Sequence, residues 1–186
     1  IQQVRKNLDL IPSSIDFAGI DLVIQGKLAR ETILTKAIKK SKENYDYVFL
    51  DCPPDMNLVT ITALTASDHV IIPVQASQFS MEVVNIMIDF VSGIRENLNP
   101  ELTILGILIT HFDERLKISK SIEQDFIDNE WKEALFKTRI RRNTAIENSQ
   151  HKDKRMTIFE YDEKSAGAKD YTKLGKEVIH RIHNYS

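Results

Sequence analysis

The 186-residue sequence has little of what marks several special classes of protein. Its single cysteine, Cys52, excludes a disulfide scaffold and a Cys-x-x-Cys metal site within one copy of the chain. No apolar run approaches the roughly 20 residues that a membrane-spanning helix needs, and no signal peptide opens the chain. No stretch rich in glycine, serine and proline divides it. These absences favour a single cytosolic domain.

The residues that are present are those of an ordinary folded domain. Hydrophobic residues make up 42% and charged residues 28%, which supplies enough apolar side chain to offset the entropy lost on folding. The net charge of −2 hides an uneven distribution. The stretch from Ser41 to Asp113 contains two cationic and ten acidic residues. The stretch from Lys137 to Arg155 contains seven cationic and two acidic residues. A compact positive segment can attract a polyanion even on a slightly acidic protein.

Apolar runs of strand length alternate along the chain with amphipathic stretches of helix length. We predict strands at 8–11, 47–50, 70–74, 102–109 and 134–140. We predict helices at 25–44, 58–66, 80–98, 118–129 and 165–183. Most of these strands are apolar without alternation, which is typical of strands covered on both faces. The pattern predicts a doubly wound α/β fold, with a mostly parallel sheet and helices on both faces.

Ligands of such sheets bind at the carboxyl ends of the strands, so the residues after Leu50, Val74, Ile109 and Ile140 are candidates for a site. Asp51 directly follows the predicted strand at 47–50. A carboxylate in this position can hold Mg²⁺, often through a water, because Mg²⁺ prefers oxygen ligands and keeps most of its hydration. Asp51 could instead only cap the next turn.

Four longer stretches together carry a more specific signal than any single residue. They are YDYVFLDCPPDMNLVTITALTASDHVIIPVQASQFSMEVV, LTILGILITHFDERLKIS, FKTRIRRNTAIENS and YDEKSAGAKDY, preceded near the start by LDLIPSSIDFAGIDL. In this order and spacing the sequence resembles the ParA/Soj family of chromosome- and plasmid-partitioning ATPases, which are relatives of MinD in the P-loop class with a deviant Walker A loop. The resemblance covers nearly the whole chain.

The resemblance implies roles for residues at the strand ends. Asp51 would be the catalytic Walker B aspartate that holds Mg²⁺ through water, and Asp51–Asp55, with Pro53 and Pro54, would belong to the region that senses the γ-phosphate. Val74–Gln75 would lie beside the active site and the dimer face. The residues expected near the nucleotide base are Thr110, His111, Ile140, Arg141, Arg142 and Asn143. Each of these loops could instead satisfy only its own backbone groups.

One position departs from the family pattern. The family commonly has a proline where this chain has Arg141. Proline fixes φ and lacks an N–H donor, whereas arginine adds a long cation. The departure places the geometry of the predicted base-binding loop in question.

The 186 residues contain no G-x-x-x-x-G-K-[ST] loop, which cradles phosphates in this class. Gly26-Lys27 and Gly175-Lys176 lack the rest of the motif. In the family the loop precedes the segment that resembles residues 8–22, and the chain begins with Ile1. We therefore expect residues 1–186 to be the C-terminal portion of a single ParA-like ATPase domain. We expect this portion alone to hydrolyse no ATP, to be poorly stable and to expose Tyr47–Leu50. A non-catalytic adaptor with the same fold is the alternative.

For the full-length protein, the resemblance implies Mg-ATP binding and hydrolysis, an ATP-dependent homodimer, and cytoplasmic, nucleoid-associated binding to DNA without sequence preference. A centromere-binding ParB-type partner would stimulate hydrolysis. The candidate DNA contacts are Lys137, Arg139, Lys164 and Lys169, although a basic residue common in the family is replaced by Ala166. A MinD-like membrane ATPase is disfavoured because the last helix lacks a large apolar insertion face. One cysteine cannot supply the ligands of the nitrogenase iron-protein relatives.

Overall fold

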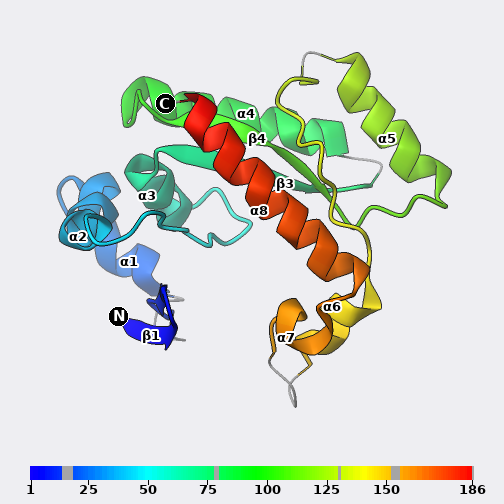
Figure 1. The fold of residues 1–186 in the computed structure, drawn as a ribbon. Coiled ribbons are helices and arrows are strands. Elements are labelled where there is room, and N and C mark those ends of the chain that lie inside the picture. Colours follow the sequence, from blue (N-terminus) through cyan, green and yellow to red (C-terminus); the bar gives the residue numbers. More distant parts are fainter. Residues whose placement is uncertain (14–18, 78–79, 130, 152–155, 186) are drawn as a thin grey trace.

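The computed structural model describes residues 1–13, 19–77, 80–129, 131–151 and 156–185. The elements, in chain order, are β1 (Gln2–Arg5), β2 (Leu8–Leu10), α1 (Ile20–Gln25), the 3₁₀ turn η2 (Arg30–Thr32), α2 (Ile33–Lys42), α3 (Leu58–Ala66), β3 (His69–Gln75), α4 (Ser80–Asn97), β4 (Thr103–Thr110), α5 (Lys117–Asp128), α6 (Thr144–Ser149), α7 (Ile158–Asp162) and α8 (Ala166–Tyr185). Figure 1 shows α8 crossing one face of the β3–β4 layer and α4 lying on the other.

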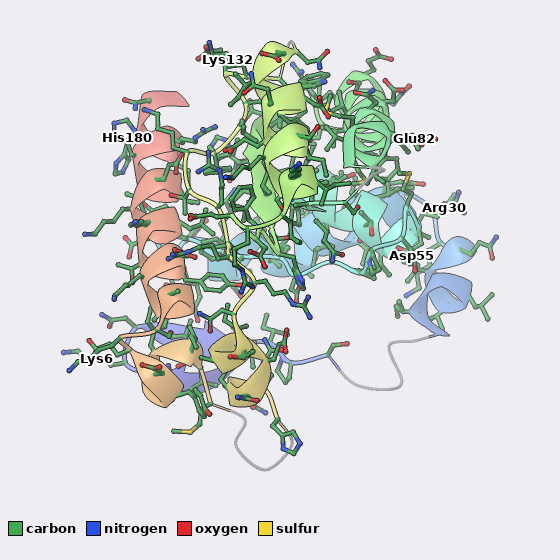
Figure 2. The ribbon with its side chains drawn as sticks, turned by 90° about the vertical axis from the view of Figure 1, so that its right-hand side faces the viewer. Lys6, Arg30, Asp55, Glu82, Lys132 and His180 are labelled. Atoms are coloured by element: carbon green, nitrogen blue, oxygen red, sulfur yellow. The ribbon has the colours of Figure 1, made fainter. Side chains whose placement is uncertain are left out.

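The N-terminal residues form a two-stranded antiparallel hairpin, β1–β2. Asn7 takes a left-handed conformation in its turn, with φ 61°, which asparagine tolerates better than most residues. An ion pair of 2.6 Å joins Arg5 to Glu160 on α7, and Figure 2 shows Lys6 at the hairpin turn beside α7. The Tyr45 hydroxyl donates a 2.6 Å hydrogen bond to Asp9. These contacts attach the hairpin to α7 and to the coil that follows α2.

Strands β3 and β4 form a parallel pair in the centre of the fold. Ile104 pairs with Val70 and Gly106 pairs with Ile71, so Leu105 is an extra residue that forms a β-bulge. The bulge resets the alternation of side chains along β4. Residues on either side of it can therefore face the same layer of helices.

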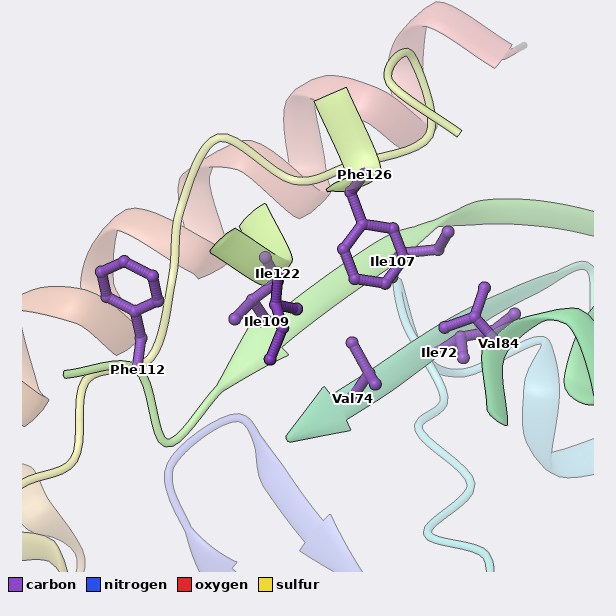
Figure 3. Packing of buried hydrophobic residues seen from close by; sticks show 8 residues of the cluster. All are labelled: Ile72, Val74, Val84, Ile107, Ile109, Phe112, Ile122 and Phe126. Atoms are coloured by element: carbon purple, nitrogen blue, oxygen red, sulfur yellow. The ribbon is translucent and has the colours of Figure 1, made fainter. Parts of the chain in front are cut away.

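The larger core lies between this sheet and the helices α4 and α5. Figure 3 shows Phe126 of α5 directed toward Ile107 of β4, and Val84 of α4 next to Ile72 of β3. Phe126, Val84 and Ile107 are completely buried. The full cluster contains Ile72, Val74, Val84, Ile107, Ile109, Phe112, Ile122 and Phe126. Burial of apolar side chains on this scale is the main force that holds the helices on the sheet.

The opposite face of the sheet packs against α8. Its core contains Leu105, Leu108, Phe136, Ile140 and Val178, with Leu174 and Ile182 of α8 packed on it. The three α8 residues follow the predicted apolar stripe, whereas Tyr171, also predicted on that stripe, is exposed.

The structure confirms most of the predicted elements within a few residues. These are the helices at 58–66, 80–98, 118–129 and 165–183 and the strands at 70–74 and 102–109.

In the N-terminal half, one predicted element is wrong and a second is confirmed only in part. Residues 47–50 form no strand but an exposed coil, and Phe49 retains 78% of its accessible surface. An apolar run becomes a strand only when a neighbour pairs with its backbone, and β3 pairs with β4 instead. The predicted helix at 25–44 is interrupted, because Ala29 has φ 50° and η2 separates α1 from α2.

The predicted strand at 134–140 is also wrong as a regular strand. The segment follows β4 with only two isolated bridges, Ile107 with Leu135 and Phe112 with Arg141. Ile107 donates to the Ala134 carbonyl at 2.8 Å and accepts from Phe136 at 2.9 Å. Other backbone groups of the segment bind side chains of α8, so a continuous ladder does not form.

Arg181 of α8 supplies much of this side-chain binding. Its guanidinium donates to the carbonyls of Leu105, Ala134 and Leu135 at 3.0, 3.1 and 2.6 Å. It also lies over the Phe136 ring, with the guanidinium carbon 4.2 Å from the ring centroid, a favourable cation–π geometry. One arginine thus joins β4, the 134–141 segment and α8.

Gly106 makes this close approach possible. A β-carbon at position 106 would lie 2.6 Å from the Phe136 ring, 2.7 Å from the Ala134 carbonyl oxygen and 2.7 Å from the Arg181 guanidinium. Two of these neighbours can adjust only by moving the packed ring or the backbone. Position 106 therefore requires glycine because of crowding.

We predict that Gly106→Ala lowers the free energy of unfolding by about 2 kcal/mol, the usual cost of overpacking. Urea unfolding would measure it. Gly175→Ala is the matched control, because nothing lies within 4 Å of a β-carbon there and alanine stabilises a helix by up to about 1 kcal/mol relative to glycine. An unchanged midpoint for Gly106→Ala would contradict the crowding.

Candidate functional site

The carboxyl ends of β3 and β4 lie side by side, as the predicted site requires. Gln75 is opposite Thr110 in the parallel register, and the Ala76 amide donates to the Thr110 carbonyl at 3.1 Å. The Thr110 hydroxyl donates to the Val74 carbonyl at 3.2 Å. Thr110 is therefore held at the strand end by its own hydroxyl, with its neighbour His111 exposed beyond it.

The backbone bends at His111, whose φ of 53° lies in the left-handed region. Phe112 then lies beside the segment that precedes α6. The Phe112 amide donates to the Ile140 carbonyl at 3.1 Å, and the Arg142 amide donates to the Phe112 carbonyl at 3.0 Å. The structure thus brings together two predicted groups, Thr110–His111 and Ile140–Arg142, that lie about 30 residues apart in the sequence.

The four residues of the loop 140–143 have different environments. The Ile140 side chain is buried in the core, so this residue can contribute only its backbone groups to a binding site. Asn143 caps α6, and its side-chain oxygen accepts from the Ala145 amide at 2.8 Å. Arg142 is exposed, with its Nε 4.0 Å from Glu147. Arg141 makes a bidentate ion pair with Asp170 of α8.

Asp113, which follows Phe112, adds a carboxylate at the same end of the sheet. Hydrogen bonds from the Arg115 side chain and backbone, together with the charges of Arg115 and Arg142, lower the pKa of Asp113 to about 2. The two side-chain hydrogen bonds from Arg115 measure 2.9 and 2.7 Å. Asp113 is therefore ionised at neutral pH.

The residues 51–54 form an exposed coil between the 47–50 segment and α3. Its far end is fixed, because Thr60 donates from its hydroxyl to the Asp55 carbonyl at 2.6 Å and Asn57 caps α3. Desolvation of the thiol and the neighbouring Asp51 charge raise the pKa of Cys52. Asp51 and the two prolines are exposed.

The chemistry of this coil fits a hydrated Mg²⁺ better than a caged metal. Within the described parts of the chain there is no group of three or more His, Cys, Asp or Glu residues that could enclose a metal ion. Mg²⁺ in nucleotide enzymes takes one or two carboxylates and completes its shell with water and phosphate oxygens. One exposed carboxylate such as Asp51 is compatible with that mode.

Comparison with known proteins identifies the family. Residues 1–104 match the family model described as an AAA domain. The chain is 36% identical over 173 residues to the sporulation initiation inhibitor protein Soj of Bacillus subtilis, covering 93% of this chain and 67% of Soj. The chain belongs to the Soj/ParA family of partitioning ATPases. The predicted resemblance is confirmed.

Solved structures agree with this Soj/ParA fold. A plasmid partition protein from Borrelia burgdorferi bound to AMPPNP matches with a TM-score of 0.73 and 22% identity, over 100% of this chain and 67% of that one. Cobyrinic acid a,c-diamide synthase from Mycobacterium smegmatis, with bound ATP analog and magnesium, matches with a TM-score of 0.65 and 27% identity, over 78% of this chain and 64% of that one. The chain spans about two thirds of the length of these relatives.

The predicted DNA contacts of this Soj/ParA-type chain have different environments. The predicted DNA contacts Lys137, Lys164 and Lys169 are exposed. Arg139 differs, because it forms an ion pair with Glu123 and its guanidinium lies 5.2 Å from the Phe112 ring centroid. The cations at 152, 154 and 155 lie outside the described residues.

Sequence reasoning missed several residues of α8. Lys173 and Lys176 are exposed and follow Lys169 at steps of four and three, so they share its face of the helix. This spacing was a readable signal. Asp170, Glu177 and Arg181 were also missed, and only the fold reveals which segment they contact.

No helix in the described ranges has the length and apolarity to cross a membrane.

Glu177 holds the 134–141 segment at its middle. Its two carboxylate oxygens accept from the amides of Lys137 and Thr138 at 2.8 and 2.9 Å. Burial acts to raise the pKa of Glu177, but a hydrogen bond from the Thr138 side chain, the two amides and the Arg181 charge outweigh it and leave the pKa below 4.5. The carboxylate is therefore stabilised in the folded state.

We predict a pH-dependent effect of Glu177→Gln. Because the folded-state pKa is lowered, the stabilisation is complete above about pH 4.5 and is lost as the pH falls through the lower folded value. Wild type should exceed the variant by about 2 kcal/mol in unfolding free energy near neutral pH, and the gap should narrow in acid. Urea unfolding at several pH values measures it. Glu133→Gln, at an exposed position, should show no gap, and a pH-independent gap for Glu177→Gln would refute the assignment.

Proposed function

We propose that the full-length protein is a DNA-partitioning ATPase that binds and hydrolyses Mg-ATP at the carboxyl ends of β3 and β4. The observation that carries the proposal is the meeting of Thr110–His111 and Ile140–Arg142 at this edge in a chain of the Soj/ParA family. The bound ATP analog and magnesium of the 27% identical synthase support the same ligands. The site lies where ligands of parallel α/β sheets bind.

The described residues divide the work of binding. Asp51 would hold Mg²⁺ through water, and the metal would supply charge neutralisation of the phosphates. Thr110–His111 and the loop 140–143 would contact the base, with the Ile140 backbone and the exposed Arg142 facing the nucleotide. The sequence contains no G-x-x-x-x-G-K-[ST] cradle, so we assign hydrolysis to the full-length protein and none to residues 1–186 alone.

Partner binding completes the proposal. An ATP-dependent homodimer would bind DNA without sequence preference through exposed lysines that include Lys137, Lys164 and Lys169. Contacts of lysine with phosphate carry no sequence information, which suits this role. A centromere-binding ParB-type protein would stimulate hydrolysis and release. The protein would act in the cytoplasm, on the nucleoid.

A non-catalytic adaptor is the second candidate, because the 186 residues contain no phosphate cradle. An adaptor would use the same surfaces to bind a partner without turnover. Titration of the full-length protein with ATP, with and without DNA, separates the two. Nucleotide-dependent DNA binding supports the ATPase, and DNA or partner binding that ignores nucleotide supports the adaptor.

We predict that Asp51→Ala in the full-length protein lowers Mg²⁺-dependent ATP turnover about a hundredfold or more, the usual effect of removing one electrostatic contact to the transition state. Steady-state phosphate release measures it. Asp46→Ala is the matched control, because Asp46 is an exposed aspartate on the other side of the 47–50 segment. Turnover equal to wild type in Asp51→Ala would overturn the assignment.

We predict that Lys137→Glu combined with Lys169→Glu weakens DNA binding while ATP affinity stays unchanged. Each lost lysine–phosphate contact should reduce the slope of log affinity against log salt by about 1. Fluorescence anisotropy with duplexes of two unrelated sequences measures the slope. Lys39→Glu combined with Lys40→Glu, both exposed on α2, makes the same charge change elsewhere. Equal losses in both double variants would mean that net charge alone governs binding.

A further inference from the structure

Arg141 and Asp170 form the most completely satisfied ion pair near the proposed base-binding loop. The Nε and one terminal nitrogen of Arg141 donate to the two carboxylate oxygens of Asp170 at 2.9 and 2.7 Å. The Arg141 backbone amide also donates to the same carboxylate at 3.2 Å. Asp170 is only 3% exposed, while Arg141 retains 38% of its side-chain surface. The buried Asp170 carboxylate therefore accepts three hydrogen bonds from Arg141.

The pair determines where the loop lies. On either side of Arg141, the backbone groups of Ile140 and Arg142 bind Phe112 at the end of β4. Arg141, between them, is directed toward α8. Its backbone amide and its guanidinium both donate hydrogen bonds to Asp170. The loop is thus fixed at three consecutive residues, two on the sheet and one on the helix.

A proline at this position would require different chemistry. A proline needs no hydrogen-bond partner for its nitrogen and fixes φ by its ring. Arginine leaves φ free and adds a cation, so its conformation must be set from outside. Asp170 provides that restraint in this chain.

We propose that Asp170 is a positioning residue for nucleotide binding: through Arg141 it holds the loop 140–143 in the conformation that contacts the base. The inference rests on the proposed function, because it assigns that loop to the base. Within the loop, Asp170 forms its hydrogen bonds with Arg141. Its effect should therefore depend on the base and not on the phosphates.

The helix offers a matched control in Glu177. Glu177 is a second carboxylate of α8 that accepts two backbone amides of the same segment. It binds at Lys137 and Thr138, where the segment runs beside β4, and not at the loop. Loss of either carboxylate removes a restraint on the segment, but only loss of Asp170 frees the loop.

The test compares two ligands on the full-length protein by titration calorimetry: Mg-ATP and Mg-tripolyphosphate, which lacks the base and sugar. Wild type should bind ATP more tightly. Asp170→Asn should weaken ATP binding about tenfold, the equivalent of one lost hydrogen bond, and leave tripolyphosphate binding unchanged. Glu177→Gln should leave the affinity for ATP and the affinity for tripolyphosphate unchanged. Arg141→Pro introduced into Asp170→Asn should restore the ATP affinity, because proline sets the loop without an anion.

The possible results distinguish failure of the Asp170 positioning role from failure of the proposed ATPase function. Failure of wild type to bind either ligand refutes the proposed function. A wild type that binds ATP no more tightly than tripolyphosphate retains the phosphate site but refutes the role of the loop. Equal weakening of both ligands by Asp170→Asn, or the same selective loss in Glu177→Gln, refutes positioning by Asp170. If Asp170→Asn alone does not fold, the double variant with Arg141→Pro carries the comparison, and a tenfold ATP deficit in it overturns the proposal.

Discussion

Three charged side chains of α8 complete the hydrogen bonding of a segment that is not a strand. Residues 134–141 leave several backbone groups unpaired by β4, and Asp170, Glu177 and Arg181 bind them. Each buried backbone group left without a partner would cost free energy comparable to a lost hydrogen bond. The helix therefore holds the segment against the sheet by polar contacts as well as by its apolar stripe.

The candidate site depends on this attachment. The loop 140–143 lies at the carboxyl end of β4 because Ile140 and Arg142 bind the backbone of Phe112 and Arg141 binds Asp170. Gly106 allows the segment and Arg181 to approach β4 closely. The bulge at Leu105 directs Leu105 and Leu108 to the α8 side of the sheet and Ile107 to the other. Packing of α8 thus fixes the position of residues that do not belong to it.

The sequence allowed much of the fold to be predicted, and the failures have a common cause. Periodicity located α3, α4, α5 and α8 because their apolar residues recur at helical spacing. It located β3 and β4 because their apolar runs have the length of strands and do not alternate with polar residues. The 47–50 run is apolar like β3 and β4, and the 134–140 run is of strand length although more polar. Whether such a run forms a strand depends on a neighbour that pairs with it, which local sequence does not report.

The site was predictable to a similar degree. Residues after the ends of buried strands were found from the pattern alone, and Thr110–His111 and Ile140–Arg142 do meet. Ile140 and Arg139 were assigned to ligands, but one side chain is buried and the other pairs with Glu123. The partners of Arg141 and of the 134–141 backbone lie 29 to 47 residues away on α8, beyond the reach of spacing rules.

The long reach of Arg181 has a consequence for synthesis of the chain. Its guanidinium binds the carbonyl of Leu105, which precedes it by 76 residues. At ribosomal rates of about 5–20 residues per second, some 4–15 s pass between the two. During that interval one face of β4 has no helix to cover it, so its leucines are open to chaperones or to other nascent chains until α8 emerges.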